Sequence, residues 1–255
     1  MASRAVDVIN TAPRFTQADA DALNARFAGV DAATMLRALF AEGTLGRVAV
    51  VSSFGTESAV LLHLVAQADP ATPVIFVDTL KMFRETLDYR ETLISTLGFT
   101  DSRTVVPDAD VLAKKDETGL RWSYDPDGCC AIRKVEPMQR ALGDFDAWVS
   151  GVRRDQGPTR ANTDVVEHHL VNGRPLAKVF PLAYWTRGQI WSYLLDNGIP
   201  YNPLLDQGYS SLGCWPCTRA TRAGEDERAG RWAGSRKTEC GLHTFTLPSA
   251  PESAE

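Results

Sequence analysis

Five cysteines are the residues of this chain best suited to chemistry, and they lie in three places. Cys129 and Cys130 are adjacent, Cys214 and Cys217 form a C-x-x-C pair, and Cys240 lies near the C-terminal end. Four thiolates from two segments can hold a metal centre, which leaves one thiolate free to act as a nucleophile. We therefore expect a metal centre at the two pairs. Taken alone, Cys240 is either a reactive thiol or an incidental cysteine of the C-terminal tail.

The spacing of the two pairs favours an iron-sulfur cluster over a zinc ion. Residues 131–213 separate Cys130 from Cys214, and an adjacent pair is a poor zinc knuckle because neighbouring residues do not readily point both sulfurs at one ion. A larger cluster, whose irons are spread apart, accepts this arrangement better. A thioredoxin-like dithiol at Cys214 and Cys217 is the rival interpretation, but such a motif belongs at an early strand-to-helix junction.

Two further residues extend this interpretation. Lys134 follows Cys130 by four positions, so a helix opening at Cys129 would place its ammonium beside the metal centre and an incoming anion. Cys240 lies in a polar tail, where exposure and the nearby Lys237 favour the reactive thiolate. We expect this tail to be mobile enough to present Cys240 first to a bound substrate and then to a partner protein.

A stretch of small and hydroxylated residues at 52–58 lies between a strand pattern and a helix pattern. Small residues let the backbone approach an anion, and the hydroxyls and free N–H groups at a helix start can donate to its oxygens. The stretch is not a Walker A loop, because that spacing and its lysine are absent. A turn that only caps the helix is the alternative. The expected anion ligands are Ser52, Ser53, Gly55, Thr56 and Ser58.

Strand and helix patterns alternate around these residues. The expected buried strands lie at 48–52, 74–78, 105–106 and 147–151. The expected helices in this region lie at 57–66 and about 84–97. Such alternation implies right-handed crossovers, with ligands at the carboxyl ends of the strands. We therefore expect an α/β fold with a parallel sheet flanked by helices.

The two ends of the chain differ from this regular middle. Residues 17–42 carry two helix patterns that end at Gly43, and we expect them to cover the sheet as a lid. A hairpin or loop is expected over 165–178, a short last strand at 179–182 and a helix over 187–196. From Tyr201 the periodicity fades, which predicts an irregular C-terminal tail.

Composition narrows the function classes. Of the 255 residues 44% are hydrophobic, and the net charge of −5 does not indicate a broad nucleic-acid-binding surface. The N-terminal residues lack the apolar core of a secretory signal, and no run is long enough to span a membrane. We expect a cytoplasmic protein without membrane contact, in which cysteines serve as metal ligands or catalysts rather than disulfides.

Residues 52–58 resemble the modified phosphate-binding loop, S-G-G-x-D-S, of the adenine nucleotide alpha-hydrolase-like superfamily, as altered in sulfonucleotide reductases. Phe54 and Glu57 depart from the ATP-cleaving form, which counts against pyrophosphate cleavage. Asp78 and Thr79 resemble the Asp-Thr-Gly that lines the adenosine pocket, and Leu80 stands where glycine is usual. The resemblance implies substrate contacts at these three positions.

The whole pattern resembles the branch of the PAPS (phosphoadenosine phosphosulfate) reductase family that acts on APS (adenosine 5'-phosphosulfate), over roughly residues 45–245. The resemblance implies that the two cysteine pairs are the ligands of one four-iron, four-sulfur (4Fe-4S) cluster per subunit. Gly151, Arg153 and Arg160 match an arginine-bearing loop, and Arg228 and Arg231 match a pair that grips the substrate anion. The implied division is a helical segment at 1–43, a nucleotide-binding domain at 44–212 and a tail at 213–255 with cluster ligands and the catalytic thiol.

The resemblance also implies a reaction within sulfate assimilation and cysteine biosynthesis. The loop and the arginines hold the phosphosulfate of APS, and Cys240 attacks its sulfur. AMP is the leaving group, and Cys240 becomes an S-sulfocysteine. A thiol of reduced thioredoxin then frees sulfite, and its second thiol resolves the mixed disulfide. We expect thioredoxin to be a separate protein, because only 15 residues follow Cys240.

Three alternatives stay open at this point. A PAPS reductase differs only in the 3'-phosphate of its substrate. An ATP-dependent tRNA-thiolating enzyme with an iron-sulfur cluster shares the fold. A non-enzymatic metal-binding or redox-sensing module would hold zinc instead of iron. Sequence also leaves open whether the protein is a homo-oligomer.

Overall fold

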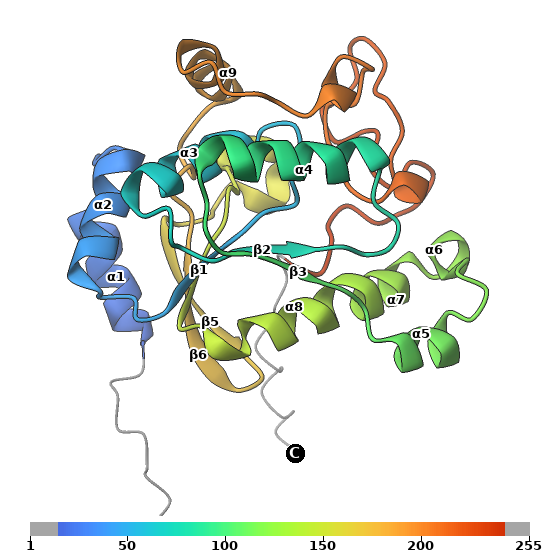
Figure 1. The fold of residues 1–255 in the computed structure, drawn as a ribbon, viewed down its shortest axis with the longest axis horizontal. Coiled ribbons are helices and arrows are strands. Elements are labelled where there is room, and N and C mark those ends of the chain that lie inside the picture. Colours follow the sequence, from blue (N-terminus) through green and yellow to red (C-terminus); the bar gives the residue numbers. More distant parts are fainter. Residues whose placement is uncertain (1–14, 243–255) are drawn as a thin grey trace, which may run out of the picture.

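In residues 15–242, which the computed structural model describes, six strands form a sheet with helices on both faces (Figure 1). The strands are β1 (Val48–Val51), β2 (Val74–Val77), β3 (Ser102–Val105), β4 (Ala147–Val149), β5 (Val166–Val171) and β6 (Arg174–Val179). Their order across the sheet is β3-β2-β1-β4-β6-β5. The chain therefore changes direction at β1, from which β2 lies on one side and β4 on the other, and ligands of such sheets bind at this point.

Strands β1, β2, β3, β4 and β6 are parallel, and β5 pairs antiparallel with β6. The expectation of a parallel sheet is confirmed for these five, and β5 adds an antiparallel edge. Asn172 and Gly173 join β5 to β6 with φ of 52° and 73°, the left-handed conformation that a type I′ hairpin turn needs. The hairpin alternative for 165–178 is thus confirmed, but the expected short strand at 179–182 is wrong, because the last strand is β6 of the hairpin and only Val179 of that range belongs to it.

The larger core lies between one face of the sheet and the helices α1 (Gln17–Arg26), α2 (Ala32–Glu42), α3 (Ser58–Ala68), α4 (Arg84–Leu97) and α9 (Arg187–Asp196). These helices match the expected ranges to within two residues. Gly43 and Gly98 end α2 and α4 with φ of 63° and 72°, a conformation that glycine adopts without a Cβ penalty. At the sheet edge, Asn24 of α1 bonds both backbone groups of Val166, at 2.8 and 2.9 Å.

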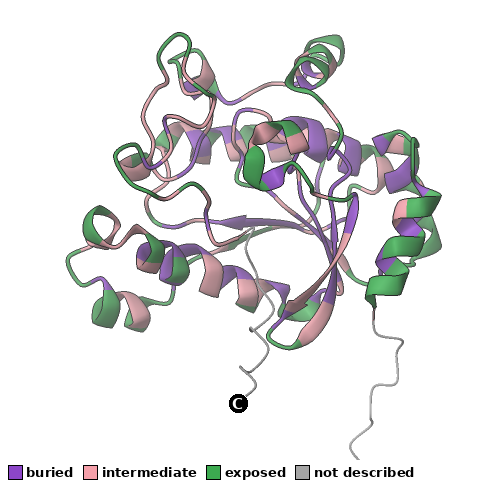
Figure 2. Cartoon of the chain, turned by 180° about the vertical axis from the view of Figure 1, so that it is seen from behind, coloured by how far each residue is buried: buried purple, intermediate pink, exposed green. Residues whose placement is uncertain are grey.

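A smaller core fills the opposite face, because alternate strand residues such as Ala49 and Trp148 point to that side. The elements drawn below the sheet in Figure 1 are α5 (Ala109–Lys115), α6 (Arg121–Tyr124), α7 (Pro126–Cys130) and α8 (Glu136–Ala141). A π-helix, Ala131–Val135, joins α7 to α8. Figure 2 shows the strands buried between helices whose outer faces are exposed.

From the end of α9 to Leu242 the chain is irregular, as expected, and this described part holds only short 3-10 turns at Pro203–Leu205 and Trp215–Cys217. Isolated bridges join Met82 to Cys214 and Thr218 to Arg231, so this segment lies against the loop that follows β2. In the part of the chain that the structure describes, no helix is both long and apolar enough to cross a membrane.

Candidate active site

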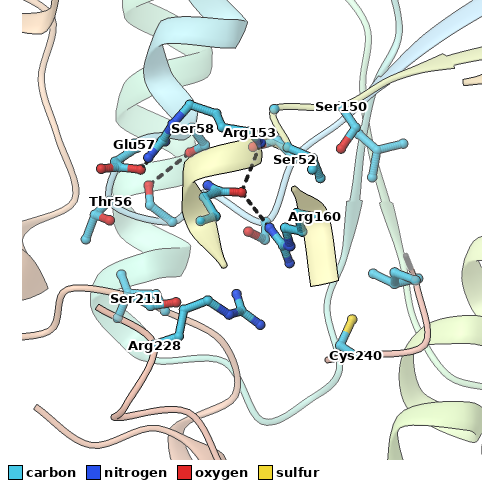
Figure 3. A pocket seen from close by; sticks show the side chains of 18 of the residues that line it. Ser52, Thr56, Glu57, Ser58, Ser150, Arg153, Arg160, Ser211, Arg228 and Cys240 are labelled. Carbon is cyan, nitrogen blue, oxygen red and sulfur yellow. Dashed lines mark hydrogen bonds and ion pairs between the residues drawn. The ribbon is translucent and has the colours of Figure 1, made fainter. Parts of the chain in front are cut away.

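A cavity lies where the loops after β1 and β4 meet the C-terminal segment (Figure 3). We refer to it as the anion cavity. The sequence-predicted residues that line it are Ser52, Ser53, Gly55, Thr56, Ser58, Lys134, Gly151, Arg153, Arg160, Arg228, Arg231 and Cys240. Segments up to 188 residues apart thus converge at the carboxyl ends of two neighbouring parallel strands.

The loop at 52–58 has the backbone of an anion cradle. Phe54 has φ of 50°, and its N–H donates to Ser52 Oγ at 3.1 Å, which holds the loop in a tight turn. Ser58 Oγ donates to the Gly55 carbonyl at 3.0 Å, and Thr56 Oγ1 donates to the Ser210 carbonyl at 3.2 Å. No side chain caps the start of α3, where the Ser58 N–H makes a long 3.4 Å bond to the Gly55 carbonyl, so an anion could accept from N–H groups of this first turn.

Arg153 is the most buried cation of the cavity, at 1% exposure. It forms ion pairs with Glu57 and, through Nε at 2.9 Å, with Asp155. Burial lowers the pKa of Arg153, but the two carboxylates outweigh burial and raise it, so the guanidinium keeps its charge. Its Nη2 is buried without a hydrogen-bond partner among the described residues. An unpaired buried donor is costly, and an oxyanion in the cavity would satisfy it.

Arg231 has a similar unused donor. Its Nη1 donates to the Leu212 carbonyl at 2.5 Å and its guanidinium lies 4.5 Å from the centre of the Trp232 ring, whereas Nε is buried without a partner in residues 15–242. Arg160 and Arg228 differ, because both donate to the carboxylate of Glu239. The four predicted arginines therefore divide into two with free buried donors and two that bind Glu239.

Cys240 lines the anion cavity and is buried, at 8% exposure. The expectation of an exposed thiol is wrong, because the tail folds back and its neighbour Glu239 pairs with Arg160. Figure 3 shows Arg160, Arg228 and Cys240 converging from three segments of the chain.

A second cavity, the cysteine cavity, is lined by all four remaining cysteines. Cys129 and Cys130 come from the end of α7, and Cys214 and Cys217 flank the 3-10 turn that faces it. Thr79 Oγ1 lies 3.1 Å from Cys214 Sγ. Two segments far apart in the sequence thus bring four thiols to one small space, as the cysteine pattern predicts.

The donor chemistry of this cavity fits a thiolate-ligated cluster. All five cysteines of the chain are free of disulfides. In residues 15–242 no group of three or more His, Cys, Asp or Glu, these four thiols included, has the geometry of a metal-ion site, so the fit rests on the identity of the donors. Burial raises the pKa of Cys129 to about 12 and that of Cys130 to about 11. Because metal ligation needs thiolates, binding of a metal centre here would release protons.

Lys134 and Arg231 line both cavities. Cys129 does not open a helix: α7 begins at Pro126, and the π-helix that follows α7 carries Lys134. Burial lowers the pKa of Lys134, but the charges of Cys214 and Cys240 outweigh burial and raise it. Lys134 is therefore a cation placed between the two thiol sites, although through a π turn rather than the expected α-helical turn.

Asp78, Thr79 and Leu80 do not line the anion cavity. Asp78 accepts a hydrogen bond from Leu80 N at 2.8 Å, Thr79 is fully buried at the cysteine cavity, and the Leu80 side chain is exposed. Leu80 has φ of 59°, so it keeps the left-handed backbone of the glycine that the resemblance expects there.

Other residues of the two sites were missed in the sequence. Glu239 and Gln156 bind the predicted Arg160, and their only signal is closeness to Cys240 and to the arginine loop. Arg133 donates to Asp116 at 2.7 Å and to the Thr79 carbonyl at 3.0 Å beside the cysteine cavity. Pairings between distant segments have no local sequence pattern that could predict them.

Comparison with known proteins agrees with this geometry. A family model described as the phosphoadenosine phosphosulfate reductase domain matches residues 47–220. The adenosine 5'-phosphosulfate reductase of Mesorhizobium japonicum is 46% identical over 200 residues, which cover 78% of this chain and 77% of that protein. The protein of the same name from Streptomyces coelicolor is 43% identical over 214 residues, or 83% of this chain and 89% of its own.

Solved structures also resemble this chain. The crystal structure of the PAPS reductase of Candida auris, in a phosphate complex, has a TM-score of 0.67 at 28% identity and covers 81% of this chain and 99% of that one. Yeast FAD synthetase, with a TM-score of 0.52 at 16% identity, shares the fold alone. The family model and the curated relatives together show that this chain belongs to the PAPS reductase family, with APS reductases among its relatives.

Proposed function

We propose that this chain is an APS reductase, an oxidoreductase that converts APS to sulfite and AMP. The observation that carries the proposal is that Cys240 lines the same cavity as the loop at 52–58 and the buried donors of Arg153 and Arg231. An anion cradle and a nucleophile on one cavity are what sulfonyl transfer requires. Relatives that are 41–46% identical and named APS reductases support the choice of substrate.

The phosphosulfate of APS would lie between the start of α3 and the arginines. The N–H groups of the loop donate to phosphate oxygens, and Arg153 Nη2 and Arg231 Nε donate to the oxyanion. Arg153 is oriented by Glu57 and Asp155, so it does not have to be ordered when substrate binds.

In the chemical step the Cys240 thiolate attacks the sulfur of APS. A sulfur–sulfur bond forms, the bond between that sulfur and the phosphate oxygen of AMP breaks, and AMP leaves with the electron pair. Lys134 and Arg231 line the cavity beside Cys240, where their positive charges would offset the negative charge of the sulfonyl group and the charge that develops on the leaving phosphate oxygen of AMP. The product on the chain is S-sulfocysteine.

A thiolate of reduced thioredoxin then attacks Cys240 Sγ and releases sulfite. The second thioredoxin thiol resolves the mixed disulfide, so two thiols are oxidised for each sulfate reduced. The reaction fits a reducing cytoplasm, the location expected from the sequence, where all five thiols stay reduced.

The cysteine cavity would hold a 4Fe-4S cluster through Cys129, Cys130, Cys214 and Cys217. When bound, the cluster supplies a charged inorganic centre next to the anion cavity. Lys134 and Arg231 border both cavities, so their cationic groups balance thiolate charge on one side and substrate charge on the other.

Two cysteine variants test the proposal. Cys240→Ser should abolish labelling of the chain by APS that carries labelled sulfate, while the iron content stays at the wild-type level. Cys214→Ser should lose iron and acid-labile sulfide from anaerobically purified protein. Wild-type labelling of Cys240→Ser would reject the nucleophile, and wild-type iron in Cys214→Ser would remove that ligand.

PAPS reduction is the second candidate, because the Candida auris structure named above is a PAPS reductase. The two activities differ in the 3'-phosphate alone. Turnover of APS and PAPS by the purified protein, compared as kcat/KM with thioredoxin present, separates them. A higher kcat/KM for PAPS would replace the first proposal with the second.

A further inference from the structure

Glu239, directly before Cys240, binds the residues that the sequence assigned to the substrate. Its carboxylate accepts bonds from Arg160 Nε at 2.9 Å and Nη2 at 2.8 Å, and from Thr159 Oγ1 at 2.9 Å. Arg228 Nη2 adds a bond at 3.1 Å. The Glu239 side chain is 12% exposed, so these are largely desolvated, charge-assisted contacts.

Arg160 uses donors on both edges of its guanidinium, one edge for Glu239 and the other for Gln156. Nε and Nη2 form a bidentate pair with Glu239, and Nη1 donates to Gln156 Oε1 at 2.5 Å. Arg153 and Arg231, by contrast, each have a buried donor without a partner among the described residues. Arg160 therefore binds the tail, whereas Arg153 and Arg231 each keep a donor that could bind an anion.

The tail around Glu239 runs close against the protein. A Cβ at Gly241 would lie 2.8 Å from Val135 Cγ2 of the π-helix, and Leu242 packs against the smaller core. The Thr238 carbonyl accepts a bond from Arg228 Nη2 at 3.0 Å. Cys240 lies between these contacts, so its position depends on the charged pair on one side and apolar packing on the other.

We propose that Glu239 is a positioning residue that holds the Cys240 thiol inside the anion cavity by pairing with Arg160 and Arg228. The inference rests on the proposed role of Cys240 as nucleophile. Replacing the carboxylate by an amide leaves two guanidinium groups with one neutral carbonyl oxygen to share, and this oxygen accepts more weakly than a carboxylate. The tail then spends more time away from the cavity, with Cys240 exposed.

Alkylation of Cys240 in substrate-free protein measures this directly, with each cysteine resolved by peptide mass spectrometry. Glu239→Gln should raise the rate at Cys240 about tenfold, since a charge-assisted contact is lost, and Glu239→Asp, which keeps the charge, should restore part of the protection. Glu225→Gln is the matched control, because Glu225 pairs with Arg219 at 2.8 Å outside the anion cavity. Wild-type protection in Glu239→Gln, or an equal increase in Glu225→Gln, would overturn the inference.

The rate of S-sulfocysteine formation tests the consequence. At saturating APS, Glu239→Gln should form it about tenfold more slowly, because a displaced nucleophile reacts from fewer productive geometries. The APS concentration for half-maximal rate should stay near the wild-type value, since Arg153 and Arg231 are unchanged. An unlabelled wild-type chain would reject the proposed function, whereas labelling of Glu239→Gln at the wild-type rate would reject only the role of Glu239.

Discussion

At the scale of single residues, the site is defined by which buried polar atoms have partners. Arg153 Nη2 and Arg231 Nε have none in residues 15–242, although both lie on the anion cavity. Folded proteins satisfy nearly all such donors. Arg90 Nε is also unpaired among the described residues but lies outside both cavities, so Arg153 and Arg231 are distinguished by combining a spare donor with a place on the anion cavity.

Arg153→Lys should raise the KM for APS about tenfold, because a lysine keeps the charge but loses the planar fork that reaches Glu57, Asp155 and the anion together. Steady-state kinetics of sulfite release measure the change. Arg84→Lys is the control, since Arg84 is exposed on α4 and its ion pair is with Asp88 of the same helix. An unchanged KM in Arg153→Lys would remove this residue from the anion site.

At the scale of elements, loops after neighbouring strands carry the site, and glycines decide how closely they approach. A Cβ on Gly213 would lie 2.2 Å from Arg231 Nη2 and 2.5 Å from its Cζ. Gly213 directly precedes Cys214, so this close approach links the cysteine cavity to the anion cavity. Gly98 has open space around its Cβ position, and its role is only to end α4.

Gly213→Ala should therefore impair function, whereas Gly98→Ala should impair stability alone. The first pushes the Arg231 guanidinium away and should reduce sulfite release about tenfold or more. The second forces alanine into φ of 72° and should lower the free energy of unfolding by about 1 kcal/mol. Kinetics and denaturant unfolding of both variants separate the two effects, and equal activity losses would contradict this assignment.

The sequence predicts most elements because their signals are local. The periodicity of α4 and the glycines after α2 and α4 place the helix ends within a residue. Strand β5 is antiparallel because a two-residue turn at Asn172 and Gly173 leaves no length for a crossover. Cys240 could not be placed from the sequence, because its burial depends on a pair between Glu239 and Arg160, 79 residues apart.

At the scale of the whole molecule, the sheet buries a lysine that neither cavity contains. Lys178 of β6 is 2% exposed, with its ammonium 4.7 Å from the Trp148 ring centre and 5.1 Å from that of Phe180. Burial lowers the pKa of Lys178 to about 8. Between pH 8 and the ordinary lysine value of 10.5 the unfolded chain binds more protons, so stability rises with pH in this window.

Lys178→Met should remove the loss of stability that comes from burying a lysine that is charged in the unfolded chain. At about pH 7 the variant gains up to roughly 3 kcal/mol in free energy of unfolding, and the gain should shrink towards about pH 10. The difference between wild type and variant in urea unfolding at the two pH values measures it. Lys114→Met, at an exposed position of α5, should show no such pH dependence. A gain that is equal at both pH values would contradict the assignment to Lys178.

Phe54 and Leu80 both have a positive φ, which is uncommon for residues other than glycine, but the packing around their side chains differs. Both adopt positive φ at loops that follow adjacent strands. The Phe54 ring is fully buried and meets Phe76 edge-on at 5.5 Å, so trimming it would open a void beneath the cradle. Leu80 is 56% exposed and covers little. A glycine at position 80 would therefore remove little packing, whereas a glycine at position 54 would ease the backbone torsion at the cost of the buried ring contact with Phe76.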